Sequence, residues 1–329
     1  MDYAQWIRYF KLTVAVDGTN TAALDLSDYR VRFSISQAVV GKPTTADITI
    51  YNVAQSTVDQ IQFPTNQEVG NKRLKVIIEA GYQNEHAIIF QGDLWWKSVG
   101  RESETDTFMR LIAAPGDTAH QYAVVNASIP AGATQEQVFT VIAQSMAEKG
   151  VESAGIPQEL ATTTKLPRGK VIYGMSAKAM QGLADTNNFL WGYGTNGLIA
   201  IPKTPSYDAQ SDVVVLTSAT GLIGRPKLTV NGVEFQCLLN PRIDVGSFVQ
   251  IDNKSIQRNA YDTSAKPSLD KNDASLDVRI SEDGLYRVIS REVVGDTRGN
   301  EWYLNLIADG VNAAVTTRSP TITNSFVNM

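Results

Sequence analysis

Cysteine and histidine are almost missing from this sequence, whose 329 residues include one cysteine, Cys237, and two histidines, His86 and His120. A disulfide framework needs paired cysteines, so a lone thiol fits a reducing compartment. Zinc sites draw on Cys and His at characteristic spacings, and nucleophilic catalysis by a Ser–His or Cys–His pair needs a positioned histidine. Both histidines lie in polar stretches that predict loops and solvated or singly hydrogen-bonded rings. Cys237 stands between Phe235 and Leu238, which predicts a buried small hydrophobe.

Long apolar runs and clusters of positive charge are missing too. No stretch approaches the 18 or more apolar residues of a membrane helix, and the acidic start Met1–Tyr3, with no apolar region after it, disfavours a signal peptide. The formal net charge is −5. This disfavours nucleic-acid binding, because nucleic-acid-binding proteins neutralise phosphates with clustered Lys and Arg. Without a secretory route, the acceptor patterns at Asn126 and Asn253 carry no glycan.

A β-hairpin stands out in what the sequence does contain. In Gly284–Ala308, two apolar runs flank a turn rich in Gly, Asp and Asn. The same order of features occurs in Gly92–Ala113. In both stretches an Arg-Glu pair precedes an Asp-Thr pair by five positions, and both stretches close on Leu-Ile-Ala. The repeat predicts two related β-domains, one near each end of the chain.

Alternating apolar residues predict strands in both end regions, since period two places one set of side chains on one face of a sheet. One such strand contributes on the order of 5–10 kcal/mol from burial, so the strands are expected to close into a barrel or sandwich. A short helical turn is expected at Ser56–Gln60. The predicted strands lie at 10–16, 31–36, 47–50 and 74–80, and strands return from Val213, with 233–239, 248–251, 285–294 and 302–308 among them.

The middle of the chain changes to a helical pattern. Thr134, with Gln137 at the capping-box position, predicts a helix through Lys149 that Gly150 ends. A loop is expected from 151 to 170 and a second helix from Ser176. A hairpin of Phe189–Trp191 with Leu198–Ile201 across Asn196-Gly197 then completes a small α+β module.

These patterns predict a mainly β chain with a small α+β insert. The first β-domain covers 1–115, the α+β domain 116–205 and the second β-domain 206–320. Within the last, a polar loop at 252–283 is expected to project as an interaction arm. The tail is 321–329.

Three stretches could carry chemistry, and each has a plainer reading. Gly192–Gly197 matches the dinucleotide fingerprint, but an apolar strand follows where a helix is required, so a hairpin is favoured. Glu102, Glu104 and Asp106 could pair as glycosidase carboxylates, but they lie between two strands, where acidic residues usually solvate a turn.

The tandem Trp95-Trp96 could stack on a sugar. Adjacent strand residues face opposite sides, so at most one could share a face with a ligand, and core packing or a protein interface is favoured for each. We therefore predict no catalytic, cofactor-binding or metal residues, no cofactor, and no enzymatic activity.

The chain resembles the central baseplate or tail hub proteins of tailed bacteriophages. The resemblance rests on an ordered set of short segments that covers nearly the whole chain. The sequence departs from larger hubs in showing no appended lysozyme or spike segment. The segments are 32–35, 47–52, 79–82, 89–92, 124–132, 220–226, 232–233, 238–241 and 245–246, followed by the hairpin with 295–297.

This resemblance implies a structural protein of the virion. Such hubs are homotrimers with two tail-tube-like β-barrel domains per chain, which join the sixfold tail tube to a threefold spike or tail-tip protein. Further implied partners are the tape measure protein and baseplate wedge or sheath-proximal proteins. Genomic DNA passes through without specific binding, and an acidic channel lining would let it slide. Assembly in the host cytoplasm without membrane insertion is implied.

Two other classes stay open. One is a tail-associated cell-wall hydrolase, which turnover of cell-wall substrate by the purified chain would indicate. The other is a glycan-binding tail module, which loss of glycan binding on Trp95→Ala would indicate.

Overall fold

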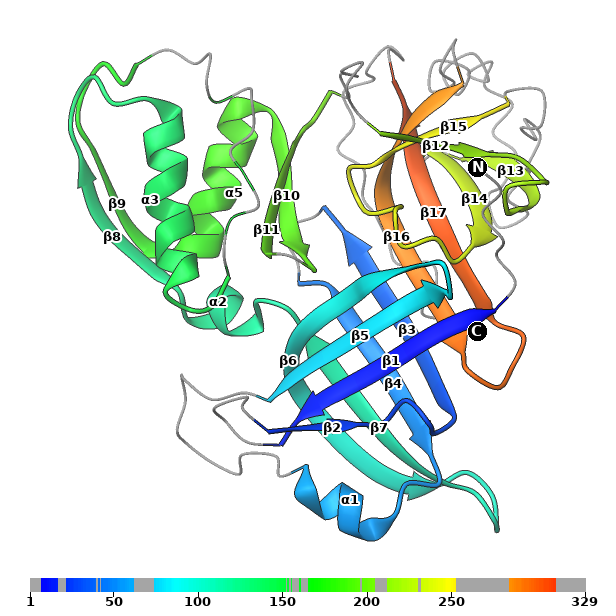
Figure 1. Ribbon diagram of the computed structural model, residues 1–329. Coiled ribbons are helices and arrows are strands. Elements are labelled where there is room, and N and C mark those ends of the chain that lie inside the picture. The colour runs from blue at the N-terminus through cyan, green and yellow to red at the C-terminus, as the bar shows by residue number, and fades with distance from the viewer. Residues whose placement is uncertain are drawn as a thin grey trace, which may run out of the picture. The chain divides into compact units, whose positions relative to one another are not determined.

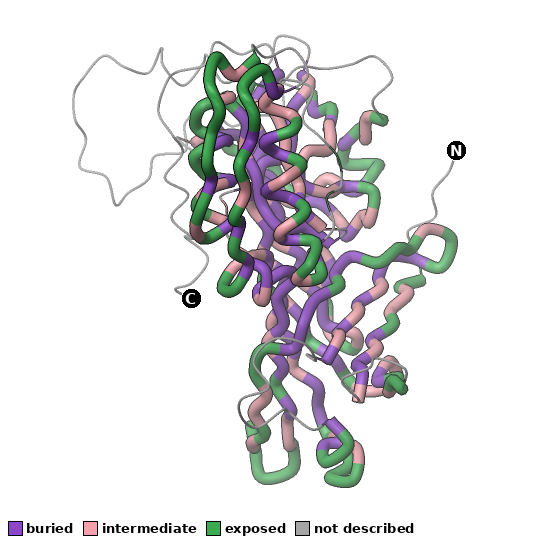
Figure 2. The backbone as a smooth tube through the Cα atoms, turned by 90° about the vertical axis from the view of Figure 1, so that its left-hand side faces the viewer, coloured by how far each residue is buried: buried purple, intermediate pink, exposed green. Residues whose placement is uncertain are grey.

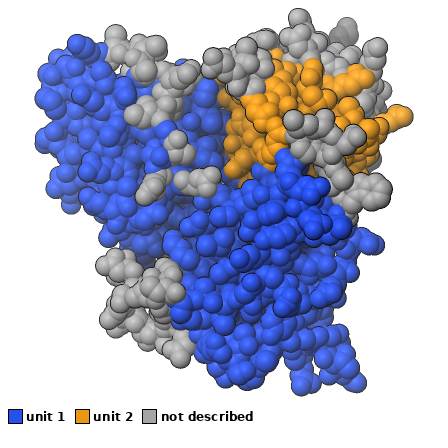
Figure 3. Space-filling model, in the orientation of Figure 1, with its two compact units in different colours: residues 1–203, 239–241, 292–302 blue, residues 204–238, 242–291, 303–329 orange. Residues whose placement is uncertain are grey.

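The chain divides into two compact units (Figure 3). Unit 1 comprises residues 1–203, 239–241 and 292–302, and unit 2 comprises 204–238, 242–291 and 303–329. The predicted division into three domains stays a prediction. None of the helices that the structure describes has the length and apolar character needed to span a bilayer. The computed structural model describes residues 7–16, 22–39, 41, 43–61, 74–151, 153, 155, 160, 165–195, 197–204, 212–229, 232–252 and 284–311.

Seven strands of unit 1 form an antiparallel sheet in the order β3-β4-β7-β6-β5-β1-β2 (Figure 1). Burial alternates along β3, as period two predicts, so that Val31 and Ile35 are buried while Arg32 is exposed. The helical turn predicted at Ser56–Gln60 is confirmed as α1 (Gln55–Gln60). The strands are β1 (Arg8–Ala15), β2 (Ala23–Asp25), β3 (Val31–Ala38), β4 (Thr45–Tyr51), β5 (Lys75–Tyr82), β6 (Glu85–Arg101) and β7 (Thr107–Ala114).

The long strand β6 changes its pairing partner at Asp93. Its first half pairs with β5 and its second half with β7, and Asp93 pairs with Lys75 on one side and Ala114 on the other. A β-bulge follows between Leu94 and Trp96. Beyond Asp93, β6 pairs with β7 alone among the described strands.

The α+β module belongs to unit 1. The capping box of α3 (Gln135–Ala147) is confirmed, because Thr134 and Gln137 each accept from the other's backbone N–H. Helices α3 and α5 bury one face each in a core that the β8–β9 ribbon and the β10–β11 hairpin complete (Figure 2). The ribbon is not predicted by the sequence. The other elements are α2 (Asp117–Tyr122), β8 (Val124–Ile129), β9 (Lys170–Met175), α5 (Ser176–Asn187), β10 (Phe189–Gly194) and β11 (Gly197–Pro202).

Unit 2 is built on the predicted hairpin, which is confirmed as β16 and β17. The strand order is β13-β14-β17-β16, with β15 antiparallel to β16 and β12 parallel to β15. The tip of the hairpin, residues 292–302, belongs to unit 1. The predicted arm, beyond Asp252, and the tail at 321–329 lie outside the described residues. The strands are β12 (Val213–Leu216), β13 (Leu222–Thr229), β14 (Gly232–Leu238), β15 (Phe248–Ile251), β16 (Leu285–Asp296) and β17 (Trp302–Gly310).

The two β-regions share one strand order. The first reads β3-β4-β7-β6-β5-β1 and the second β13-β14-β17-β16-β15-β12, with counterparts in the same sequence order. They differ in the outermost pair, because β1 runs antiparallel to β5 whereas β12 runs parallel to β15. The strands of the two β-regions form a large, mainly antiparallel sheet without a closed barrel among the described residues, so the predicted barrel form stays a prediction.

The sequence repeat is only partly structural. Its Leu-Ile-Ala ends are equivalent, because Leu111 pairs with Ile48 on β4 and Leu306 pairs with Phe235 on β14, at the same distance from the start of their strands. The Asp-Thr pairs are not equivalent. Asp106-Thr107 begins the second strand of its hairpin, whereas Asp296 ends the first strand of the other.

Candidate interaction surfaces

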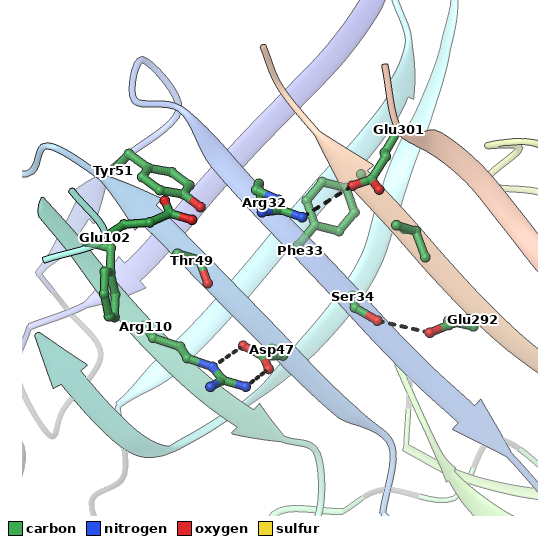
Figure 4. A pocket seen from close by; sticks show the side chains of 13 residues that line it. Arg32, Phe33, Ser34, Asp47, Thr49, Tyr51, Glu102, Arg110, Glu292 and Glu301 are labelled. Carbon is green, nitrogen blue, oxygen red and sulfur yellow. Dashed lines mark hydrogen bonds and ion pairs between the residues drawn. The ribbon is translucent and has the colours of Figure 1, made fainter. Parts of the chain in front are cut away.

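A polar groove of about 480 Å³ lies in unit 1, over β3, β4, β7 and the tip of the β16–β17 hairpin (Figure 4). Period two places these side chains together on the face of the sheet opposite the core. Four carboxylates and two arginines line it. The lining residues are Arg32, Phe33, Ser34, Asp47, Thr49, Tyr51, Glu102, Phe108, Arg110, Glu292, Val294, Gly295 and Glu301.

The charges in this groove are largely paired. Two N–H groups of Arg110 donate to the carboxylate of Asp47, and the Arg110 Nε lies 2.8 Å from Asp47 Oδ1. The hydrogen bonds to Asp47 raise the pKa of Arg110. Ser34 Oγ donates to Glu292 Oε1 at 3.3 Å, and Arg32 lies 3.8 Å from Glu301. The carboxylates outnumber the arginines among the lining residues, so the groove carries a net negative charge that repels anions.

The hairpin tip is anchored by Asp296, which is 3% exposed. Its carboxylate accepts from Arg30 Nη2 at 2.8 Å and from the backbone N–H groups of Arg298 and Gly299, each at 2.9 Å. Burial by itself would raise the pKa of Asp296, but these hydrogen bonds outweigh it and hold the pKa below its usual value. Arg8 also donates to Gly299 O, so the tip is tied to β1 and β3.

Trp95 and Trp96 are both exposed, at 51% and 42%. The opposite-face expectation rested on strict alternation, and a bulge interrupts that alternation here, because Trp95 is an extra residue between Leu94 and Trp96. Neither side chain packs in the core. Two neighbouring exposed tryptophans favour the protein-interface reading made from the sequence.

The structure corrects the expected surroundings of both histidines. His86 lies in β6, stacks on Tyr9 with ring centroids 3.8 Å apart, and places Nε2 3.4 Å from Glu79. His120 lies in α2, edge-on to Tyr193. The predicted loops are therefore wrong at both positions, since each ring packs on a regular element.

The structural interpretations favoured for the glycine-rich stretch, the acidic cluster and Cys237 agree with the structure. Gly194 pairs with Gly197 in the β10–β11 hairpin, and a strand follows, so the dinucleotide reading is wrong. The acidic cluster is exposed in the β6–β7 turn, where Asp106 accepts from Asn52 Nδ2 at 3.0 Å. Cys237 is buried on β14, which raises its thiol pKa to about 12.

Within the described residues, no group of three or more His, Cys, Asp or Glu could hold a metal ion. Among the groove residues, Glu102 was the one that the sequence offered as a site candidate. The available signal was the set of charged residues at the outward positions of adjacent strands, such as Arg32, Asp47 and Arg110.

The comparisons with known proteins point to one kind of assembly. The family model described as baseplate hub gp41 matches residues 9–256. A search of the curated proteins returns no match.

Several solved structures share the fold at low identity. The 43 kDa tail protein of prophage MuSo2 from Shewanella oneidensis is 8% identical, with a TM-score of 0.53 over 93% of this chain and 100% of that one. A tail protein from Neisseria meningitidis is 8% identical, with a TM-score of 0.55 over 94% and 98% of the two chains. A chain of the lidded Francisella PdpA–VgrG complex is 8% identical, with a TM-score of 0.53; 97% of this chain covers 55% of that one.

The resemblance drawn from the sequence is confirmed by these findings, which give the chain a structural role in a phage tail or baseplate. Because the family model spans most of its length, the chain belongs to the baseplate hub gp41 family.

Proposed function

We propose that three copies of this chain form a ring on the tail axis, which joins the sixfold tail tube to a threefold spike or tail-tip protein. The observation that carries the proposal is the shared strand order of the two β-regions. A threefold molecule that meets a sixfold tube needs six similar faces, and two tube-like β-barrel domains per chain supply them. Ring formation also covers sheet edges that would otherwise invite aggregation.

The partners follow from that position. The tail tube protein packs on one side and the spike or tip protein on the other, with the tape measure protein and baseplate wedge or sheath-proximal proteins as further contacts. The hub assembles in the host cytoplasm, without membrane insertion, and stays in the virion tail.

DNA passes through the ring without specific binding. The chain carries a net charge of −5, and the carboxylates of the groove outnumber its arginines. Fixed negative charge repels phosphate and disfavours a tight complex. A lining of this charge lets DNA slide through.

A map of the purified tail tests this position. We expect three copies between the tube and the spike. Six copies in one ring, or a location away from the tail axis, would contradict the proposal.

The competing functions have direct tests as well. A zymogram of the purified chain on peptidoglycan is expected to show no clearing, and clearing that one carboxylate substitution abolishes would establish the hydrolase. Glycan binding that Trp95→Ala removes would establish the sugar-binding module, which the exposure of Trp95 keeps as the second candidate.

A further inference from the structure

Each β-region has open strand edges among the described strands, and one in each region is the counterpart of a strand that is paired inside the chain. In the first region, β6 beyond Asp93 pairs with β7 alone, because its pairing with β5 ends there. In the second region, β13 pairs with β14 alone. An open edge carries unpaired backbone N–H and C=O groups and is a template for another strand.

The chain itself shows how two such edges meet. In the shared strand order, β6 corresponds to β16 and β13 corresponds to β3. Within unit 1, the tip of β16 pairs with β3. Thr297 N–H donates to Val31 O, and Val31 N–H donates to Thr297 Oγ1, each at 3.0 Å. The open edges are therefore the counterparts of the two strands already joined.

We propose that β6 of one copy pairs with β13 of the next copy, as β16 pairs with β3 inside each chain. This inference rests on the proposed ring of three. The contact is heterologous, because different strands meet, and a heterologous contact whose rotation closes generates a ring. The direction is antiparallel, since Thr297 lies beside Val31 while the earlier Glu292 lies beside the later Ser34.

Strand pairing inside the chain sets the register on the β6 side. The first hairpin closes with Arg101 opposite Thr107, and the second with the Asp296 N–H donating to Glu301 O. With the starts of β7 and β17 aligned, Gly100 is the counterpart of Val294.

The register on the β13 side follows from β4 and β14. Ser34 pairs with Asp47, and Lys227 pairs with Glu234. Asp47 and Glu234 face equivalent isoleucines of β7 and β17, so Lys227 is the counterpart of Ser34. Inside the chain Thr297 lies opposite Val31, so the antiparallel pairing places Val294 opposite Ser34. The counterparts therefore place Lys227 opposite Gly100 of the next copy.

The chemistry of the two edges fits this partner. Trp95 and Trp96 flank the open part of β6, and tryptophan is enriched among the residues that dominate interface energy. Pro226 lies in the bulge of β13, at the kind of edge position that tolerates proline, so the pairing forms on both sides of it. Exposed Arg225 and Lys227 are basic, whereas the end of β6 runs into the acidic turn that starts at Glu102.

Cysteine cross-linking of the full chain tests the register. The double variant Gly100→Cys/Lys227→Cys carries both halves of the contact, so mild oxidation should link chains into disulfide-bonded species of up to three copies. Native Cys237 can stay, since it is buried. The matched control Ser34→Cys/Val294→Cys uses the internal counterparts and should form its disulfide within one chain. Each single variant should give no ladder.

The sample is the purified chain over a range of concentrations, together with assembled tails, and the native mass or copy number is measured in parallel. Linked chains in either sample support the inference. Associated chains that never link, while the control pair does, overturn the inference and leave the proposed ring intact. Chains that associate in neither sample overturn both.

A second measurement covers a cross-link that fails for steric reasons. Trp95→Ala/Trp96→Ala removes exposed side chains only, so folding should be kept. We expect association to weaken about 30-fold, as for loss of an interface anchor. Association unchanged by this variant would overturn the placement of the contact at β6.

Discussion

β6 and β16 take the same place in their β-regions, yet their side chains meet opposite surroundings. Trp95 and Trp96 on β6 are 51% and 42% exposed, whereas Arg287 and Arg291 on β16 are each 2% exposed. The large apolar residues face solvent and the charged residues are buried, against the usual preference. The comparison teaches that the neighbours a strand keeps within the chain decide burial more than the residue's own polarity.

Arg291, one of the two buried arginines of β16, shows which contacts a buried charge requires. Arg291 donates through Nη1 to Ile243 O at 2.9 Å, and its Nη2 lies 3.3 Å from Asp244. Burial lowers the pKa of Arg291, and the carboxylate of Asp244 opposes that shift. A buried charge is tolerated only where it is paired and hydrogen-bonded, so this strand is specified by polar contacts inside unit 2.

The largest expected effect comes from shortening a core side chain at the same register in each β-region, which tests whether the two regions are equivalent. Leu111→Ala and Leu306→Ala each empty a buried site at the same register, and each should cost about 3 kcal/mol of unfolding free energy. Urea unfolding measures the loss. Hydrogen exchange should place it in unit 1 for Leu111→Ala and in unit 2 for Leu306→Ala. Full tolerance of one variant would show that the two registers are not equivalent.

The two Asp-Thr pairs offer a sharper contrast. Asp296→Ala removes a buried carboxylate and leaves its donors without their acceptor, at a cost of about 2 kcal/mol in unfolding free energy. Asp106→Ala is the matched control, because Asp106 follows the same sequence pattern but is exposed, and its loss should be clearly smaller. Equal losses by urea unfolding would show that the hairpin tip is not anchored as described.

The pH dependence of stability should follow Asp296. Its pKa in the folded state is lowered, so its contribution is present above the unfolded pKa of about 3.9 and is lost as pH falls through the folded value. The stability difference between the native chain and Asp296→Asn should therefore shrink from about pH 6 to about pH 2. A difference that grows on acidification would reverse the sign assigned here.

The strands of the first region could be predicted because their apolar residues keep period two through whole strands, as in Val31–Ile35. The repeat located both hairpins, but only its Leu-Ile-Ala ends mark equivalent positions, because identical short pairs can fall on different sides of a turn. The β8–β9 ribbon was missed since small and polar residues such as Asn126 and Ser128 dilute its pattern.

The surfaces were harder to predict than the strands. A one-residue bulge beside Trp95 interrupts the alternation of side chains between the two faces of the strand, and no local pattern in the sequence indicates it. The groove around Asp47 and Arg110 requires knowing that β4 and β7, far apart in sequence, are neighbours. Pairing between distant strands is therefore the information that the sequence patterns lacked.

The smallest expected effect separates exposed from buried charge pairs. Asp47 and Arg110 make a two-pronged contact, but their side chains are 39% and 46% exposed. Solvent screens such a pair, so Asp47→Ala should cost only about 0.5 kcal/mol of unfolding free energy, well below the cost of Asp296→Ala. The double variant Asp47→Ala/Arg110→Ala should be close to the sum of the single ones, with a coupling that salt weakens. A coupling as large as the whole effect of Asp296→Ala would mean that something covers the groove, and would make it an interface rather than an open polar face.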